Sequence, residues 1–104
     1  MDAVKQQKLE ASGWRIGSAN EFLGLSADQA ELVEVRLRLA RALRGERERL
    51  HVTQAVLAKR LGSSQSRVAK IEAGDPSVSL DLMVRALLSL GASRRELAEW
   101  LAAA

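Results

Sequence analysis

The sequence predicts an all-α fold with five helices over residues 26–104, preceded by a short helical or irregular extension over residues 1–25. Three observations predict this fold. Apolar residues recur at helical spacing along most of the chain, and serine, threonine and glycine residues interrupt them at positions that suit helix ends. The one stretch with strand-like alternation has no second strand with which it could pair.

The composition fits one small globular domain and argues against several kinds of site. The chain has 104 residues, of which 47% are hydrophobic and 28% are charged. It contains no cysteine and a single histidine, His51, so we expect no disulfide, metal site, cofactor or catalytic centre, and no enzymatic activity. No apolar run approaches the roughly 18 residues of a membrane span, and the polar start of the chain does not resemble a signal peptide. We therefore expect a cytoplasmic protein.

Charge is distributed unevenly along the chain. Residues 1–34 contain six acidic and three basic residues, a net charge of −3, whereas residues 35–104 contain thirteen basic and seven acidic residues, a net charge of +6. The positive excess favours a nucleic-acid partner for the second segment. A solvated basic surface is the alternative that charge alone leaves open.

The extension over residues 1–25 combines glycines with large apolar side chains. Residues 3–11 suit a short helix, and the glycine-punctuated stretch after it contains Trp14, Phe22 and Leu23. Such side chains are expected to pack on a surface. That surface belongs either to the chain's own domain or to a partner, so these three residues are candidate partner-binding residues.

A long helix is expected to begin after Ser26, which forms a capping-box pattern with Gln29. Residues 33–39 alternate apolar and polar side chains and locally resemble a strand. We predict a helix because this stretch lies between the cap and the helix-forming run of residues 40–44. Gly45 is expected to weaken the helix without ending it. The side predicted to be buried carries Leu32, Val35, Leu39 and Leu43.

Residues 53–74 predict a short helix, a tight turn and a second helix. Thr53 is a suitable N-cap, Gly62 follows the last apolar residue of the first helix, and Ser63 or Ser64 can cap the second. Ala58 is expected at the helix crossing, where only a small side chain fits. This pattern is typical of a helix-turn-helix. The predicted inward-facing residues are Leu57, Ala58, Leu61, Val68 and Ile71.

Two further helices are expected after this motif. Asp75-Pro76 marks a turn, Ser79 caps a helix that ends at Gly91, and a capping-box pattern between Ser93 and Glu96 opens a last helix. The last helix either completes the core or forms a dimer interface. The predicted buried residues of the two helices are Leu80, Met83, Val84, Leu87, Leu88, Leu90, Leu97, Trp100 and Leu101.

The helix-turn-helix resembles that of the XRE family, which includes the small lambdoid phage repressors. The resemblance extends over about residues 33–90 and implies a compact five-helix lambda-repressor-like DNA-binding domain over residues 26–104. The residues that carry it are Thr53-Gln54, Leu57-Ala58, Gly62, Gln65, Val68, Ile71-Glu72 and Gly74.

In such a domain the second helix of the motif lies in the DNA major groove. Its outward-facing residues Gln65, Ser66, Arg67 and Lys70 are the candidate base contacts. Gln65 matches a base-reading glutamine of the phage-repressor relatives, whereas Arg67 could equally read a guanine or clamp a phosphate. The candidate phosphate contacts are Gln54, which matches a phosphate-contacting glutamine of those relatives, Ser64 and Arg60. For Arg60 a solvated surface position is the alternative, with at least equal weight.

Arg47 and Glu72 match two positions that form a buried ion pair in the phage-repressor relatives, so we expect a structural role for both. His51 is expected in the turn before Thr53, where a solvated side chain is favoured over a phosphate contact. One recognition helix covers only a few base pairs, which predicts a homodimer on palindromic double-stranded DNA.

Residues 9–14, 21–26 and 64–72 resemble the corresponding segments of HigA-type antitoxins, which pair with RelE/HigB-like toxins. This resemblance implies an antitoxin that neutralises a basic mRNA-cleaving toxin and represses its own operon. The acidic N-terminal third could provide the toxin-binding surface. The alternatives are a stand-alone XRE regulator of the phage or restriction-controller type, and a helical adaptor that has lost DNA binding.

Overall fold

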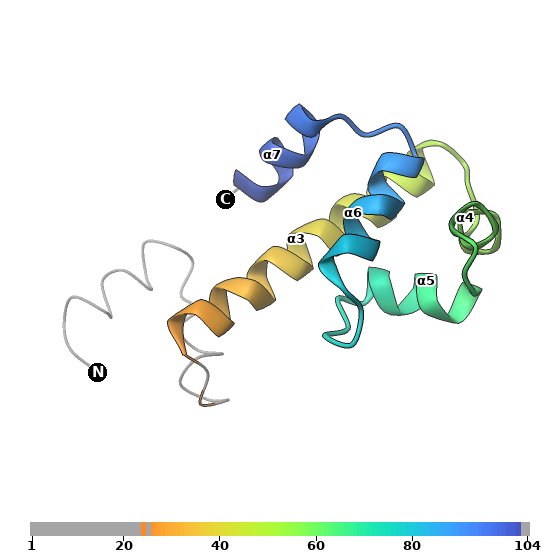
Figure 1. The fold of residues 1–104 in the computed structure, drawn as a ribbon. Helices are drawn as coiled ribbons and strands as arrows, with labels where there is room; N and C mark the ends of the chain where they lie inside the picture. The colour runs from red at the N-terminus through yellow and green to blue at the C-terminus, as the bar shows by residue number, and fades with distance from the viewer. Residues whose placement is uncertain (1–23, 25, 103–104) are drawn as a thin grey trace. The chain divides into compact units, whose positions relative to one another are not determined.

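The computed structural model describes residue 24 and residues 26–102, and within them it contains five α-helices and no strand. The helices are α3 (Ala27–Arg49), α4 (Gln54–Leu61), α5 (Gln65–Glu72), α6 (Leu80–Ser89) and α7 (Arg94–Ala102) (Figure 1). This arrangement confirms the predicted all-α fold. The predicted helix over residues 3–11 and the candidate partner-binding residues Trp14, Phe22 and Leu23 lie outside the described residues.

The first turns of α3 show why the helix begins at Ala27. The backbone N–H of Ser26 donates to Gln29 Oε1 at 2.9 Å, and the N–H of Gln29 donates to Ser26 Oγ at 3.3 Å. This is the predicted capping box, and it satisfies backbone donors that the first helical turn leaves open. The start of the predicted domain at residue 26 remains a prediction.

The core lies in the compact unit Val35–Ala103. Helix α3 continues through residues 33–39 and past Gly45, as predicted, and buries Leu39 and Leu43. Leu32 was expected on the same buried side, but its side chain is 41% exposed. It precedes Val35 and is not part of the core cluster.

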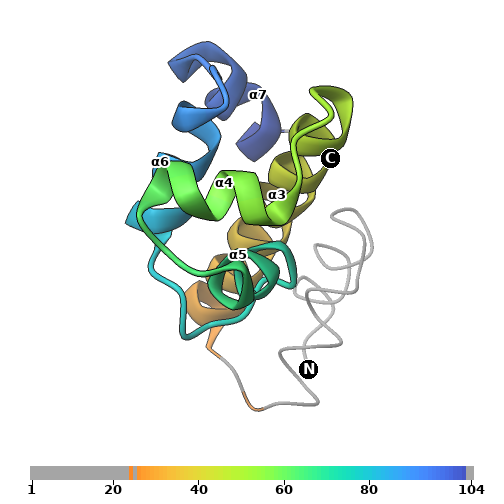
Figure 2. The same cartoon turned by 90° about the vertical axis from the view of Figure 1, so that its right-hand side faces the viewer.

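Helices α4 and α5 form the predicted helix-turn-helix. They cross at a steep angle. Figure 1 shows α4 end-on and α5 from the side, whereas Figure 2 shows α4 from the side and α5 nearly end-on. Gly62 has a left-handed backbone with φ 63°, which an L-residue adopts at a cost. The N–H of Gly62 donates to the Lys59 carbonyl, and that of Ser63 donates to the Ala58 carbonyl. These two bonds form a Schellman motif that ends α4.

The predicted inward-facing residues of this motif are all buried: Leu57, Ala58, Leu61, Val68 and Ile71. They join one apolar cluster with residues of α3 and α6. A second left-handed glycine, Gly74, ends α5 with φ 70°, and a Cβ placed there would lie 3.1 Å from Leu37 Cδ2. The backbone after α5 therefore passes close to α3 because this residue has no side chain.

Helix α6 buries Met83, Ala86 and Leu87, and its C-cap Leu90 continues the same buried stripe at helical spacing. Leu88 was predicted to be buried but is 46% exposed, because it lies one residue, about 100°, beyond this stripe.

Helix α7 packs Leu97 and Trp100 against the cluster, so it completes part of the core. Leu101, also predicted to be buried, is 44% exposed. No helix among the described residues is long and apolar enough to cross a membrane.

Candidate nucleic-acid interface

Helix α5 exposes the four candidate base contacts. Ser64 is its N-cap, and the Ser64 hydroxyl accepts from the N–H of Arg67 at 3.2 Å. Val68 and Ile71 are fully buried and fix which side of the helix faces the core. The opposite, exposed side carries Gln65, Ser66, Arg67 and Lys70. Amide, hydroxyl, guanidinium and ammonium groups are those that bond the edges of bases and the phosphates of DNA.

The candidate phosphate contacts lie at the ends of the two helices. Gln54 is the first residue of α4 and is half-buried, whereas Ser64 and Arg60 are exposed. The N–H groups of a helix start and a nearby polar side chain can address one phosphate together. The Ser64 oxygen already accepts from the backbone, so its hydroxyl hydrogen is the group available to a phosphate.

The structure brings Arg47 and Glu72 together in a largely buried ion pair. Arg47 Nε donates to Glu72 Oε2 at 2.6 Å, and Arg47 Nη2 donates to Glu72 Oε1 at 3.0 Å. The side chains are only 14% and 6% exposed, respectively. The hydrogen bond that Arg47 donates to Glu72 raises the pKa of Arg47 above its ordinary value. The pair ties the end of α3 to the end of α5.

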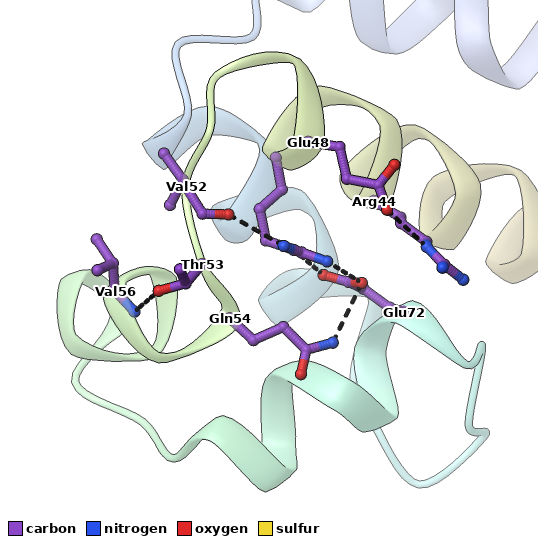
Figure 3. Close-up of polar contacts among 8 residues, drawn as sticks. Arg44, Glu48, Val52, Thr53, Gln54, Val56 and Glu72 are labelled. Atoms are coloured by element: carbon purple, nitrogen blue, oxygen red, sulfur yellow. Dashed lines mark hydrogen bonds and ion pairs between the residues drawn. The ribbon is translucent and has the colours of Figure 1, made fainter.

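The same two side chains bind the start of α4. Arg47 Nη1 donates to the carbonyl of Val52, the residue before the N-cap Thr53, at 3.0 Å. Gln54 Nε2 donates to Glu72 Oε1 at 3.3 Å. Figure 3 shows the Gln54 carboxamide and the Val52 carbonyl on either side of this network. The end of α3, the start of α4 and the end of α5 are thus joined at one buried carboxylate.

Two other arginines of α3 tie it to later parts of the chain. Arg36 Nη1 donates to the carbonyl of Val78, in the segment between α5 and α6. Arg38 Nη1 donates to the carbonyl of Leu101 in α7, at 3.2 Å. Neither bond was predicted from the sequence. The sequence contains no signal for their partners, because the bonded residues are 42 and 63 positions apart.

The last turns of α3 carry two pairs within the helix. Arg44 Nε donates to Glu48 Oε1 at 3.0 Å, and Arg49 Nη2 donates to Glu46 Oε2. Both arginines are more than 60% exposed, so each pair contributes little stability. Each pair nonetheless cancels a positive charge on the surface of α3.

The cations of α4 and α5 are different. Among the residues that the structure describes, their side chains form no hydrogen bond or ion pair with the protein. All are exposed: Lys59, Arg60, Arg67 and Lys70. Unpaired exposed cations are available to DNA phosphates and base edges without first breaking a bond within the protein.

His51 ends α3 in a left-handed conformation, φ 57°, and is exposed. Its N–H donates to the Glu48 carbonyl at 3.1 Å, and the N–H of Val52 donates to the Arg47 carbonyl at 3.0 Å. These bonds again form a Schellman motif, in which histidine takes the place that glycine takes after α4. The predicted turn is therefore present. Its left-handed residue was not predicted, because no glycine in residues 46–52 marks such a position in the sequence.

The described residues contain no group of three or more histidine, cysteine, aspartate or glutamate side chains that could hold a metal ion. The candidate interface consists of polar side chains, exposed cations and helix starts on α4 and α5.

These features define a helix-turn-helix DNA-binding protein. The model of a protein family described as a helix-turn-helix domain matches residues 38–100, and the chain belongs to this family. The chain is therefore an XRE-like DNA-binding regulator, and proteins of such families are typically not enzymes. No curated protein and no solved structure matches the chain.

Proposed function

We propose that this protein is a sequence-specific transcriptional repressor that binds a palindromic operator as a homodimer. The observation that carries the proposal is the exposed side of α5. It presents the carboxamide of Gln65 and the guanidinium of Arg67, together with the unpaired cation Lys70. Because α5 is held by two buried residues and a capped start, these groups are presented from a rigid element.

The proposed roles follow from the chemistry of each side chain. Gln65 would bond N6 and N7 of an adenine, and Ser66 and Lys70 would contact neighbouring base edges. Arg67 would read O6 and N7 of a guanine or clamp a phosphate. Contacts from Gln54, Ser64 and Arg60 to phosphates would set the position of the protein on the duplex without reading sequence.

The first experiment is footprinting of the full chain on the DNA upstream of its own gene, with light scattering of the protein. We expect a protected palindrome whose half-sites lie about 10 base pairs apart, or a multiple of that, and a dimer in solution. Affinity should fall steeply with salt concentration. Equal affinity for all duplexes would contradict sequence-specific repression.

We further propose that this repressor is the antitoxin of a type II toxin–antitoxin pair. Two observations support the proposal: the resemblance of residues 9–14, 21–26 and 64–72 to HigA-type antitoxins, and the net charge of −3 over residues 1–34. An acidic segment with the apolar anchors Trp14, Phe22 and Leu23 would suit a basic RelE/HigB-like toxin.

Co-expression with the product of an adjacent small reading frame tests the antitoxin role. A stable complex that is lost on deleting residues 1–25 would support a toxin-binding arm in that segment. A homodimer that binds its upstream DNA but no such product would favour the stand-alone regulator of the phage or restriction-controller type.

A further inference from the structure

Gln54 joins the buried Arg47–Glu72 pair to the surface proposed to contact DNA. It is the first residue of α4, and its Nε2 donates to Glu72 Oε1 at 3.3 Å. The Glu72 side chain is 6% exposed, whereas Gln54 is half-buried and reaches the surface. In Figure 3 the Gln54 carboxamide nitrogen points toward Glu72 and its oxygen points away.

The chemistry of Glu72 fixes the orientation of this carboxamide. An ionised carboxylate only accepts hydrogen bonds, so Gln54 must turn its NH2 group, and not its oxygen, toward Glu72. One amide hydrogen is then occupied. The second hydrogen has no partner among the described residues. A DNA phosphate is also only an acceptor, so this second N–H is the part of the side chain that can bond it.

Glu72 is itself immobilised. Both of its carboxylate oxygens accept from Arg47, at 2.6 and 3.0 Å. The third nitrogen of the Arg47 guanidinium, Nη1, donates to the carbonyl of Val52, the residue immediately before the N-cap of α4. The carboxylate and the backbone that starts α4 are therefore fixed by one guanidinium, and Gln54 is placed relative to both.

We propose that Glu72 is a positioning residue for DNA binding. Its Oε1 holds one amide hydrogen of Gln54, which aims the other N–H of the same carboxamide at a DNA phosphate beside the start of α4. A glutamine side chain ordered in this way loses less conformational entropy when it binds a phosphate. The inference rests on the proposed DNA binding.

The test is a mutant cycle measured as affinity for a duplex of arbitrary sequence about two helical turns long, since a phosphate contact does not depend on sequence. The wild type is compared with three variants: Gln54→Ala, the double variant with Arg47→Met and Glu72→Met, and the triple variant with all three substitutions. Replacing both charges avoids leaving one buried charge without its partner. Thermal unfolding establishes that each protein is folded at the temperature of the binding measurement.

We expect Gln54→Ala and the Arg47→Met, Glu72→Met protein each to weaken binding by about 3- to 10-fold, the range of one hydrogen bond. The triple variant should bind as well as Gln54→Ala, because Glu72 acts through Gln54. If the triple variant instead shows the product of the two losses, the pair is only structural and the inference is wrong. A wild type that binds no duplex would overturn the proposed function itself.

Salt dependence separates Gln54 from the charged contacts. Gln54→Ala should leave the slope of log affinity against log salt concentration unchanged, because a neutral side chain releases no counterion. Arg60→Ala, the matched control at the other end of α4, should lower the slope by about 1. A change of slope in Gln54→Ala would contradict the neutral contact.

A measurement on the free wild type keeps the inference testable if the Met variants do not fold. Side-chain amide hydrogen exchange is compared by NMR between Gln54 and Gln65, which is exposed and has no bonded carboxamide among the described residues. The Gln54 amide should exchange several-fold more slowly. Equal exchange rates would show that Glu72 does not hold the side chain, which overturns the inference.

Discussion

Two regions of the unit Val35–Ala103 are rich in positive charge and use it differently. Helix α3 carries six arginines, and five of them donate to acceptors within the protein: Arg36, Arg38, Arg44, Arg47 and Arg49. Helices α4 and α5 carry four cations that, among the described residues, form no such bond. Most arginines of α3 are therefore bonded within the protein, and Arg36, Arg38 and Arg47 connect α3 to other segments, whereas the positive charge of the helix-turn-helix is available to a partner.

This difference shows that the number of basic residues on a helix does not by itself locate a nucleic-acid surface. The exposed arginines Arg44 and Arg49 each lie beside a glutamate of the same helix, which weakens the field over α3. The exposed side of α5 carries no ion pair among the described residues, and the charge of Lys70 makes only a small contribution to lowering the pKa of Asp75.

The largest effect is expected from removing a bonded arginine of α3. Arg47→Ala would leave the Glu72 carboxylate buried without its partner, so we expect a loss of about 3–5 kcal/mol in the free energy of unfolding. Urea unfolding measures this loss. The preference among DNA bases, measured at a temperature where the variant is folded, should change little.

Arg44→Ala is the matched control for Arg47→Ala. Its pair with Glu48 is 3.0 Å long, but the two side chains are 67% and 57% exposed. We expect a loss of about 0.3–0.5 kcal/mol or less. An Arg47→Ala protein as stable as Arg44→Ala would contradict the structural role of the buried pair.

The second prediction concerns the unpaired groups of α5. Gln65→Ala and Arg67→Ala should each weaken the preference for one base by about 1–3 kcal/mol if the side chain reads a base. The free energy of unfolding should hardly change, because both residues are exposed and not bonded through their side chains. Binding to a set of operators with single substitutions measures the preference.

The two possible roles of Arg67 give different results in the same experiment. A guanine reader loses discrimination at one operator position, whereas a phosphate clamp loses affinity equally for all sequences and lowers the salt slope by about 1. A loss of stability in either variant would show that its side chain supports the fold, as the bonded arginines of α3 do, rather than serving only to contact DNA.

Most local features of the fold could be predicted from the sequence, because they depend on neighbouring residues. The caps Thr53 and Ser64, the left-handed Gly62 and the buried Val68 and Ile71 follow from side-chain chemistry and helical spacing. The helix over residues 33–39 was also predicted against its strand-like alternation, since no second strand existed to satisfy its backbone groups.

The features that were missed depend on distant parts of the chain or on small rotations. The bond from Gln54 to Glu72 spans 18 residues, and that from Arg36 to Val78 spans 42, which no local pattern encodes. Leu88 was predicted to be buried because it is apolar, but one step along a helix turns it out of the core. The ion pair of Arg47 and Glu72 was expected only through the family resemblance.

The third prediction tests whether His51 belongs to the scaffold or to the DNA-facing surface. His51→Gly should raise the free energy of unfolding by about 0.5–1 kcal/mol, because glycine adopts the left-handed conformation, φ 57°, without the steric cost of a Cβ. Urea unfolding measures the gain. DNA affinity should be unchanged if the imidazole makes no phosphate contact.

Gly62→Ala is the reverse control for His51→Gly. It should destabilise the protein by about 1 kcal/mol for the same conformational reason. A Cβ at this position has no atom within 4 Å, so no clash adds to the effect. A loss of DNA affinity in His51→Gly, with stability raised as expected, would move His51 to the group of phosphate contacts.

The smallest effect is expected at Asp75, where a carboxylate rather than a cation organises the chain after α5. Asp75 Oδ1 accepts from the N–H of Ser77 at 2.8 Å, and this bond lowers the pKa of Asp75 below its ordinary value of 3.8, with smaller contributions from the charges of Lys70 and Arg36. A carboxyl whose pKa is lower in the folded protein stabilises the fold fully above its unfolded pKa. That contribution is lost as the pH falls through the lowered pKa.

Unfolding free energy should therefore decline as the pH falls below about 4, and Asp75→Asn should decline less steeply, because its carboxamide oxygen accepts from Ser77 at every pH. Equal pH dependence of the two proteins would show that the Asp75 bond contributes no stability. A steeper decline in the wild type at low salt than at high salt would show that Lys70 and Arg36 act on Asp75 through their charge. Lys70 would then serve the fold as well as the DNA-facing side of α5, and the division between the two groups of cations would not be complete.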